Sequence, residues 1–168
     1  MSAMFNAPTD SLARAVHDLL LAQKQTLAIA ESCTGGLITH LLTNLPGSSA
    51  YLIAAVIAYA YEAKVAALGV SWDTLREHGA VSPEIAREMA RGARERFVAS
   101  LGVAVTGIAG PGGSTPEKPV GLTYIALASA DDVIIERYVW QGDREQNKMQ
   151  SADAVLKLLQ RYLAKGGS

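Results

Sequence analysis

An apolar run at residues 26–30 breaks directly into a turn of small polar residues, and this junction constrains the fold more than any other feature of the chain. A short apolar run bounded by turn signals indicates a buried strand, and a helical pattern follows over residues 35–44. The turn between them, Ala30 to Gly36, would lie at the positive end of a helix, where backbone amides and the helix dipole favour negative charge. We therefore expect either an anion-binding turn or a turn that carries a reacting serine.

Helical and strand patterns continue to alternate along the chain. Helices are expected at residues 10–24, 35–44 and 62–68. Two more are expected to begin at caps, one at Ser82-Pro83-Glu84 and one at a capping box at 143–146. Strands are expected at residues 26–30, 51–59, 103–106, 121–128 and 133–140. The last two strands are separated by a hairpin signal at residues 129–132. This order predicts an α/β fold, a three-layer αβα sandwich with a mixed sheet. Residues 1–168 contain no internal repeat or linker, so we expect a single domain.

Charge and composition limit the kinds of partner and cellular location expected for this chain. The net charge is -1 and no lysine or arginine run is present, so no nucleic-acid partner is expected. The longest apolar stretch, residues 51–61, is about half the length that spans a bilayer, which argues against membrane insertion. Residues 1–9 lack the features of a signal peptide and the chain has one cysteine, so a cytoplasmic location is expected. The absence of HExxH and CxxC motifs predicts no metal site.

Three segments are rich in small polar residues: 31–36, 46–49 and 106–115. The first and third follow expected strands, so both are expected at the carboxyl edge of the sheet, where open α/β sheets bind ligands. Their glycines allow close backbone approach to an anion. None of them matches the GxGxxG or GxxxxGK[ST] phosphate-binding patterns. The alternative that these segments are ordinary connecting turns stays open for each one taken alone.

Ser32 has two interpretations, as the cap of the following helix or as a nucleophile. A nucleophile needs an oxyanion site, which backbone amides near Cys33 to Gly36 can supply, and it needs a base. No GxSxG motif is present and the three histidines lie at ordinary positions, so a Ser-His-Asp triad finds no support. A lysine can serve as the base if burial lowers its pKa. Lys64, just after an expected buried strand, is the candidate, with an ordinary surface lysine as the alternative.

Two further residues invite a functional interpretation. Cys33 is a possible nucleophile in place of Ser32, because a helix N-terminus lowers the pKa of a thiol, but no histidine pairs with it and it ranks below the serine. Arg144 lies in the expected first turn of the last helix, where the helix dipole disfavours a cation. It is either recruited for an anionic ligand or is an exposed arginine beside Asp143 and Glu145.

Seven ordered motifs carry a resemblance to a known family. They are AESCTGG (30–36), PGSSA (46–50), AY-x-x-EAK (58–64), HGAVS (78–82), TGIAGPGG (106–113), TPEKPVG (115–121) and GDRE (142–145). Together they resemble the CinA C-terminal domain family, whose characterised members are nicotinamide-nucleotide amidohydrolases. The resemblance covers residues 10–163, and the amino-terminal domain of full-length CinA proteins has no counterpart here, so a stand-alone form is expected.

The resemblance implies hydrolysis of the carboxamide of nicotinamide mononucleotide to nicotinic acid mononucleotide and ammonia, a step of pyridine nucleotide (NAD) salvage. It implies a reaction with no cofactor and no metal, in which Ser32 is the nucleophile, Lys64 the proton acceptor and Tyr59 an orienting or relaying group. Substrate-binding roles are expected for Cys33, Thr34, Gly35, Gly36, Gly47, Ser48, Tyr61, Thr106, Gly107, Gly110 and Arg144. Amides near residues 33–35 would hold the oxyanion, and residues 47–49, residues 106–113 and Arg144 would surround the ribose and phosphate. A homo-oligomer, with a dimer favoured, is also expected.

One position departs from the family's usual Tyr-Ser-Asn-Glu-Ala-Lys pattern, because Tyr61 stands where asparagine is usual. A bulky phenol beside the site makes a catalytically impaired, nucleotide-binding paralogue the alternative to an active amidohydrolase. A competence or DNA-damage partner protein is a third possibility that rests on the family name alone, and the near-neutral charge gives it no support.

Overall fold

The structure is a computed structural model and describes residues 7–166. Its helices are α1 (Ala7–Gln23), α2 (Leu37–Thr43), α3 (Tyr61–Leu68), α4 (Trp72–His78), α5 (Pro83–Arg96) and α6 (Arg144–Ala164), with a 3-10 turn η1 (Ser48–Ala50). Its strands are β1 (Leu27–Glu31), β2 (Leu52–Ile57), β3 (Leu101–Gly107), β4 (Leu122–Ala128) and β5 (Val133–Val139).

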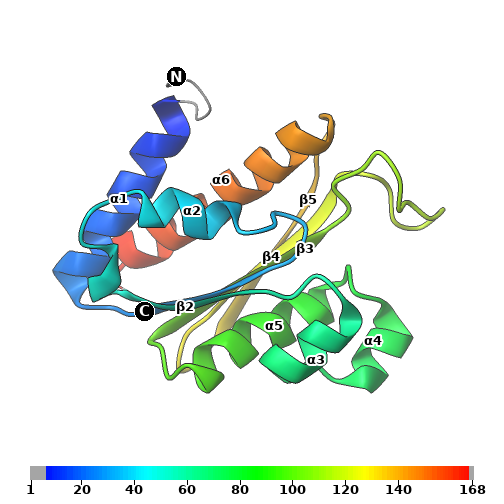
Figure 1. Cartoon of the computed structure of the whole chain (residues 1–168), viewed down its shortest axis with the longest axis horizontal. Coiled ribbons are helices and arrows are strands. Elements are labelled where there is room, and N and C mark those ends of the chain that lie inside the picture. The colour runs from blue at the N-terminus through cyan, green and yellow to red at the C-terminus, as the bar shows by residue number, and fades with distance from the viewer. Residues whose placement is uncertain (1–6, 167–168) are drawn as a thin grey trace.

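The five strands form one mixed sheet in the order β2-β1-β3-β4-β5. β1 pairs in parallel with both β2 and β3, while β4 runs antiparallel to both β3 and β5. Helices α1, α2 and α6 cover one face of the sheet, and α3, α4 and α5 lie on the other face (Figure 1). The α/β class with a mixed sheet between helical layers is therefore confirmed.

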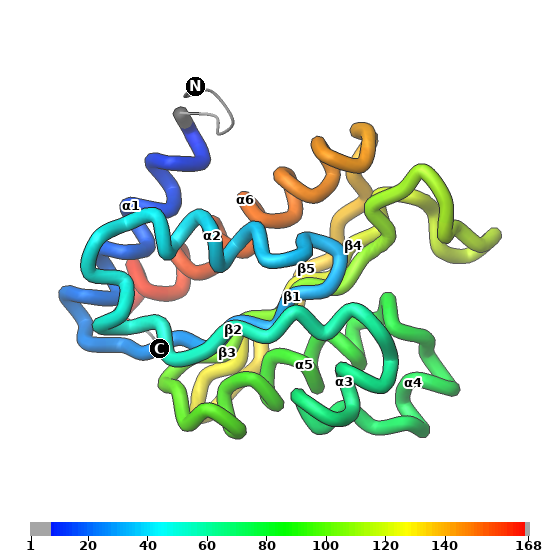
Figure 2. Tube along the Cα trace, in the orientation of Figure 1, coloured from blue at the N-terminus to red at the C-terminus, as the bar shows by residue number. Residues whose placement is uncertain are grey.

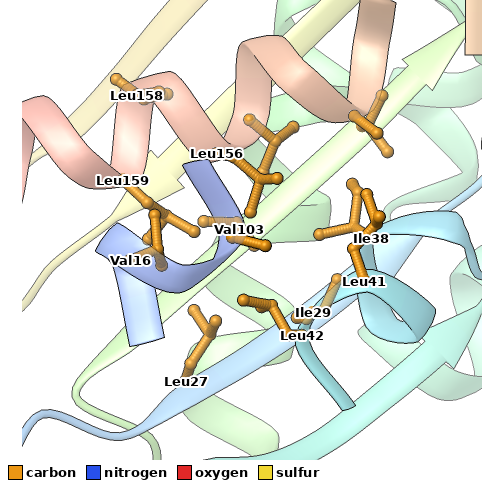
Figure 3. Packing of buried hydrophobic residues seen from close by; sticks show 14 of the residues in the cluster. Val16, Leu27, Ile29, Ile38, Leu41, Leu42, Val103, Leu156, Leu158 and Leu159 are labelled. Carbon is orange, nitrogen blue, oxygen red and sulfur yellow. The ribbon is translucent and has the colours of Figure 1, made fainter. Parts of the chain in front are cut away.

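Large aliphatic side chains line the sheet face beneath α1, α2 and α6. Leu27 and Ile29 point to this side from β1, as Val103 does from β3, and all three are buried. They pack against side chains such as Leu42 of α2 and Leu159 of α6 (Figure 3). Burial of each such side chain contributes about 1.5–3 kcal/mol, so this layer supplies the main part of the core.

The opposite face of the sheet is lined by small residues. Ala28 and Ala30 alternate with the large residues of β1 and are buried against α5. At Gly102 of β3 a Cβ atom would lie 2.2 Å from the carbonyl oxygen of Ala90, so α5 packs directly onto the strand backbone. This close approach explains why the two sheet faces have such different side-chain sizes along one alternating pattern.

The helix boundaries show how local chemistry sets each element. α2 begins at Leu37, two residues later than expected, because Gly35 and Gly36 have φ values of 64° and 98°. The expected caps of α5 and α6 are confirmed, and α6 has a complete capping box between Asp143 and Gln146. Sequence analysis did not predict α4, a seven-residue helix.

Strand direction determines which loops meet. Because β1, β2 and β3 are parallel, the segments that follow them (32–36, 58–60 and 108–121) lie at one edge of the sheet (Figure 2). The segment 46–49 precedes β2 and therefore lies at the opposite, amino edge. Over residues 7–166, no helix combines the length and apolar character needed to cross a membrane.

Candidate active site

Ser32 and Lys64 form a buried pair at the carboxyl edge of the parallel strands. Lys64 Nζ lies 3.1 Å from Ser32 Oγ, and the two residues are 1% and 8% exposed. Ser32 is fixed directly after β1, where its amide donates to the carbonyl of Val105 in β3. Lys64 reaches it from α3, one turn into a helix that begins just after β2. The structure thus brings these two candidate residues together in space.

The environment of Lys64 suits a proton acceptor. Its Nζ also lies 2.6 Å from the carbonyl oxygen of Ala58 and 3.2 Å from that of Tyr59. Burial lowers the pKa of Lys64 from 10.5 to about 8. A neutral amine has two N–H donors, which the two carbonyls can accept, and one lone pair, which is then left for the hydroxyl of Ser32. The surface-lysine alternative is therefore wrong.

Cys33 is a poor nucleophile in this position. Its thiol is buried and packs against the end of β3, where a Cβ atom on Gly107 would lie 3.2 Å from Sγ. Burial raises the pKa of the Cys33 thiol to about 12, so almost no thiolate exists at neutral pH. Burial outweighs the effect expected for a thiol at a helix N-terminus, and Ser32 stays the candidate nucleophile.

The buried thiol leads to a direct prediction. At pH 8, alkylation of Cys33 by iodoacetamide is expected to be about 10³-fold slower in the folded protein than in urea, because only the thiolate reacts. Mass spectrometry of timed samples measures both rates. A native rate close to the rate in urea would show that a thiolate is present and would restore Cys33 as a candidate nucleophile.

Glu31, which sequence analysis did not assign to the site, organises the turn that carries Ser32. Its fully buried carboxylate accepts hydrogen bonds from the Thr34 hydroxyl at 2.6 Å and the Gly36 amide at 3.0 Å. It also accepts from the Ile38 amide at 3.2 Å and from the amide and hydroxyl of Thr39 at 2.9 and 2.7 Å. One carboxylate thus occupies the donors at the start of α2.

The contacts of Glu31 correct the expected roles of the glycine turn. The Thr34 hydroxyl and the Gly36 amide are bound to Glu31, and the Gly35 amide donates to the carbonyl of Ser32 at 3.0 Å. These three residues do not line the cleft, and their contacts hold the turn in shape. The Cys33 amide, which follows the serine, makes no hydrogen bond to another residue within the described part of the chain. The signal for Glu31 was a carboxylate that ends an otherwise apolar strand.

Tyr59 and Arg144 meet at the rim of the cleft. Arg144 Nη2 donates to the Tyr59 hydroxyl at 3.0 Å, and Nη1 donates to the carbonyl of Gly110 at 2.6 Å. The Tyr59 side chain is 58% exposed, and among the described residues its phenol has no hydrogen bond to Ser32 or Lys64. Its backbone carbonyl, and not its phenol, contacts the lysine. Tyr59 is therefore placed to orient Arg144 and a ligand at the rim.

The cleft has a volume of about 240 Å³ and contains most of the expected site residues. Those that line it are Ser32, Cys33, Tyr59, Lys64, Thr106, Gly107, Gly110 and Arg144; the further lining residues are Ala80, Val81, Ile108, Ala109, Gly112 and Gly113. Thr106 is buried and donates to the carbonyl of Ala80 at 2.7 Å, which joins the end of β3 to the loop before α5. Within residues 7–166, no three His, Cys, Asp or Glu side chains form a group that could hold a metal ion.

Three further residues expected at the site do not line the cleft. Gly47 and Ser48 are at the amino edge of the sheet, where Gly47 neighbours His17, so the expectation that they line this cleft is wrong. Tyr61 does not line the cleft, and its hydroxyl accepts a hydrogen bond from the Ala80 amide at 3.3 Å. The phenol that replaces the usual asparagine thus leaves the space around Ser32 open.

The fold and the cleft define an α/β protein with a buried serine–lysine pair where parallel strands end. The chain belongs to the CinA C-terminal domain family, whose model matches residues 9–163. It is 49% identical over 152 residues to a CinA-like protein of Chlorobaculum tepidum and 46% identical over 166 residues to one of Syntrophus aciditrophicus. These matches cover 88% and 98% of the chain but only 36% and 40% of the relatives' length.

Solved structures of the same family share the fold over nearly their full length. A competence/damage inducible protein, CihA, from Agrobacterium tumefaciens matches with a TM-score of 0.92 and 37% identity, covering 96% of this chain and 99% of that one. A CinA superfamily protein from Klebsiella pneumoniae matches with a TM-score of 0.90 and 30% identity, covering 94% and 98%.

Proposed function

We propose that this protein is an amidohydrolase that converts nicotinamide mononucleotide to nicotinic acid mononucleotide and ammonia. The observation that carries the proposal is the buried contact of 3.1 Å between Lys64 Nζ and Ser32 Oγ, with burial lowering the pKa of the lysine to about 8. Such a pair can activate a serine without histidine. The substrate is the one that the resemblance implies for members of the CinA C-terminal domain family, whose model matches residues 9–163.

Acylation begins when Ser32 Oγ attacks the carboxamide carbon and its proton passes to the lone pair of neutral Lys64. The negative charge that develops on the carboxamide oxygen is stabilised by the Cys33 amide, the N–H that directly follows the nucleophile. The carbon–nitrogen bond then breaks, and the Lys64 ammonium gives its proton to the leaving nitrogen, which departs as ammonia. The product of this half-reaction is an ester on Ser32.

Deacylation uses the same groups in reverse. Lys64, neutral again, takes a proton from a water molecule as the water attacks the ester carbon. The tetrahedral intermediate collapses, and the proton returns through Lys64 to the Ser32 oxygen. Nicotinic acid mononucleotide is released, and its new carboxylic acid loses the second water proton to solvent. Within the site, Ser32 and Lys64 carry out every proton transfer, and the Cys33 amide only stabilises the oxyanion.

The cleft walls are consistent with a pyridine ring on the reacting side. Val81, Ile108 and Ala109 supply apolar surface beside Ser32. Tyr59 and Arg144 lie at the rim, where a polar ribose phosphate would extend. Arginine suits a phosphate because its guanidinium presents several donors in a fixed plane.

Incubation with nicotinamide mononucleotide tests the proposal through the release of ammonia, measured with a coupled glutamate dehydrogenase assay. We expect kcat/KM to rise as the pH increases through about 8 and to level off above it, because only the neutral form of Lys64 can take the serine proton. Binding of the nucleotide by calorimetry with no ammonia at any pH would overturn the proposal and favour the nucleotide-binding paralogue.

A further inference from the structure

We propose that Lys148, one turn after Arg144 on α6, is a second phosphate-binding residue, so that the site selects carboxamides that carry a phosphate monoester. This inference rests on the proposed function and identifies the substrate class of the same site. Lys148 is half-buried beside the glycine turn: a Cβ atom on Gly35 would lie 3.7 Å from its Nζ. Sequence analysis did not select it.

Helix N-termini often bind phosphates, but the two that lie beside the glycine turn and Arg144 are occupied by the protein's own side chains. At the start of α2, the Glu31 carboxylate takes the amides of Gly36 and Ile38 and the donors of Thr39. At the start of α6, the Asp143 side chain accepts from the Gln146 amide at 2.9 Å, and the Gln146 side chain accepts from the Asp143 amide at 3.0 Å. An anion beside these two helix starts therefore needs other donors, and cationic side chains are the groups that also supply the opposite charge.

Lys148 differs from the two other cations beside the cleft in the partners that its side chain has. Lys64 is buried and has three partners, and Arg144 is already tied to Gly110 and Tyr59. The side chain of Lys148, by contrast, makes no hydrogen bond or ion pair to any residue in the described range 7–166. Its amine is thus free to meet a ligand.

Position on the helix directs Lys148 towards the cleft. Residues four apart lie on the same helix face about 5–6 Å from each other, so Lys148 and Arg144 are neighbours. Long helical side chains lean towards the helix N-terminus, which for Lys148 is the side of the cleft. Burial raises the pKa of the Cys33 thiol, and the charge of Lys148 opposes this rise, as expected for a cation close to the site.

The size of the cleft supports a phosphate position outside it. Its volume of about 240 Å³ lies below the range of roughly 300–1,000 Å³ usual for complete ligand sites, so a nucleotide would place its ring inside and its phosphate at the rim. A phosphate monoester carries a charge of about -1.5 to -2 at pH 7. Two neighbouring cations balance that charge, whereas one leaves part of it unpaired.

Steady-state kinetics of Lys148→Met with two substrates tests the proposal. For nicotinamide mononucleotide we expect KM to rise about 10- to 100-fold with kcat changed less than about threefold, because the lost contact is equal in the ground and transition states. For nicotinamide riboside, which lacks the phosphate, we expect kcat/KM to change less than about threefold. Lys148→Arg should restore most of the affinity, and Lys157→Met, an exposed lysine of the same helix, is the matched control.

Each contrary outcome overturns the proposal. An equal loss with both substrates would place Lys148 in turn structure or oxyanion stabilisation, and an unchanged KM would exclude a phosphate contact. Calorimetry with nicotinic acid mononucleotide separates this test from the proposed function, since it needs no turnover. If the protein releases no ammonia but Lys148→Met binds that nucleotide 10- to 100-fold more weakly, the proposed function fails and the phosphate site stands.

Discussion

Lys64→Met is expected to lower kcat for nicotinamide mononucleotide at least about 10³-fold while the protein remains folded, because the variant has no proton acceptor within reach of Ser32. Methionine matches the volume of the buried lysine stem. Removing the amine relieves the cost of burying a charge but leaves the carbonyls of Ala58 and Tyr59 without their partner, so the two effects on stability oppose each other. Initial rates of ammonia release and a thermal unfolding curve measure the two properties separately.

Combination with Ser32→Ala shows whether the two residues act as one unit. In that case the double variant is expected to be no slower than the worse single variant, since each change alone already removes the activated nucleophile. Losses that multiply would show that Lys64 acts apart from Ser32. Retention of more than a tenth of the wild-type rate by Lys64→Met would remove the lysine from the proposed mechanism.

Sequence patterns predicted the parts of this fold that depend on local periodicity and caps. Short apolar runs identified all five strands, and the Asp143 capping box marked the start of α6. α4 escaped prediction because its seven residues bury only Leu75, which gives no repeating apolar face. Its Ser71 cap, which accepts from the amides of Asp73 and Thr74, was the available signal.

The structure brings predicted site residues together where motif and topology agree. Ser32 and Lys64 each lie just beyond a strand in a parallel set, so the fold brings them together across 32 residues of sequence. Gly47 and Ser48 belong to a turn that is also rich in small polar residues, but this turn precedes β2 and therefore lies at the other edge of the sheet. Composition identifies a flexible turn, and strand direction alone decides where it lies.

The role of Glu31 was missed because a side chain that accepts hydrogen bonds from backbone amides has no characteristic sequence spacing. A buried carboxylate is costly unless it is fully hydrogen-bonded, so its presence at the end of an apolar strand implies donors that the sequence does not display. Those donors come from the turn and from the first residues of α2. The glycines that sequence analysis assigned to substrate binding shape the turn around this carboxylate.

Glu31→Gln is therefore expected to destabilise the protein by about 3–5 kcal/mol. Both carboxylate oxygens of Glu31 accept hydrogen bonds, and in glutamine one of them is replaced by an NH₂ group, which would face N–H and O–H donors. In a chain of this size the melting temperature should fall by about 10 °C, as measured by calorimetry. Thr39→Val removes the hydroxyl donor and the exposed Glu95→Gln removes only a charge, so the expected order of loss is Glu31→Gln, then Thr39→Val, then Glu95→Gln.

Activity should follow the same order, which separates a positioning role for Glu31 from a purely structural one. Glu31 holds the turn that places Ser32 and the Cys33 amide, so at temperatures where Glu31→Gln is still folded we expect kcat to fall at least about tenfold with KM changed less. The apparent pKa of the kcat/KM profile should stay near 8, because the surroundings of Lys64 are untouched. A destabilised variant with wild-type kcat would show that Glu31 stabilises α2 and leaves the geometry of the serine unaffected.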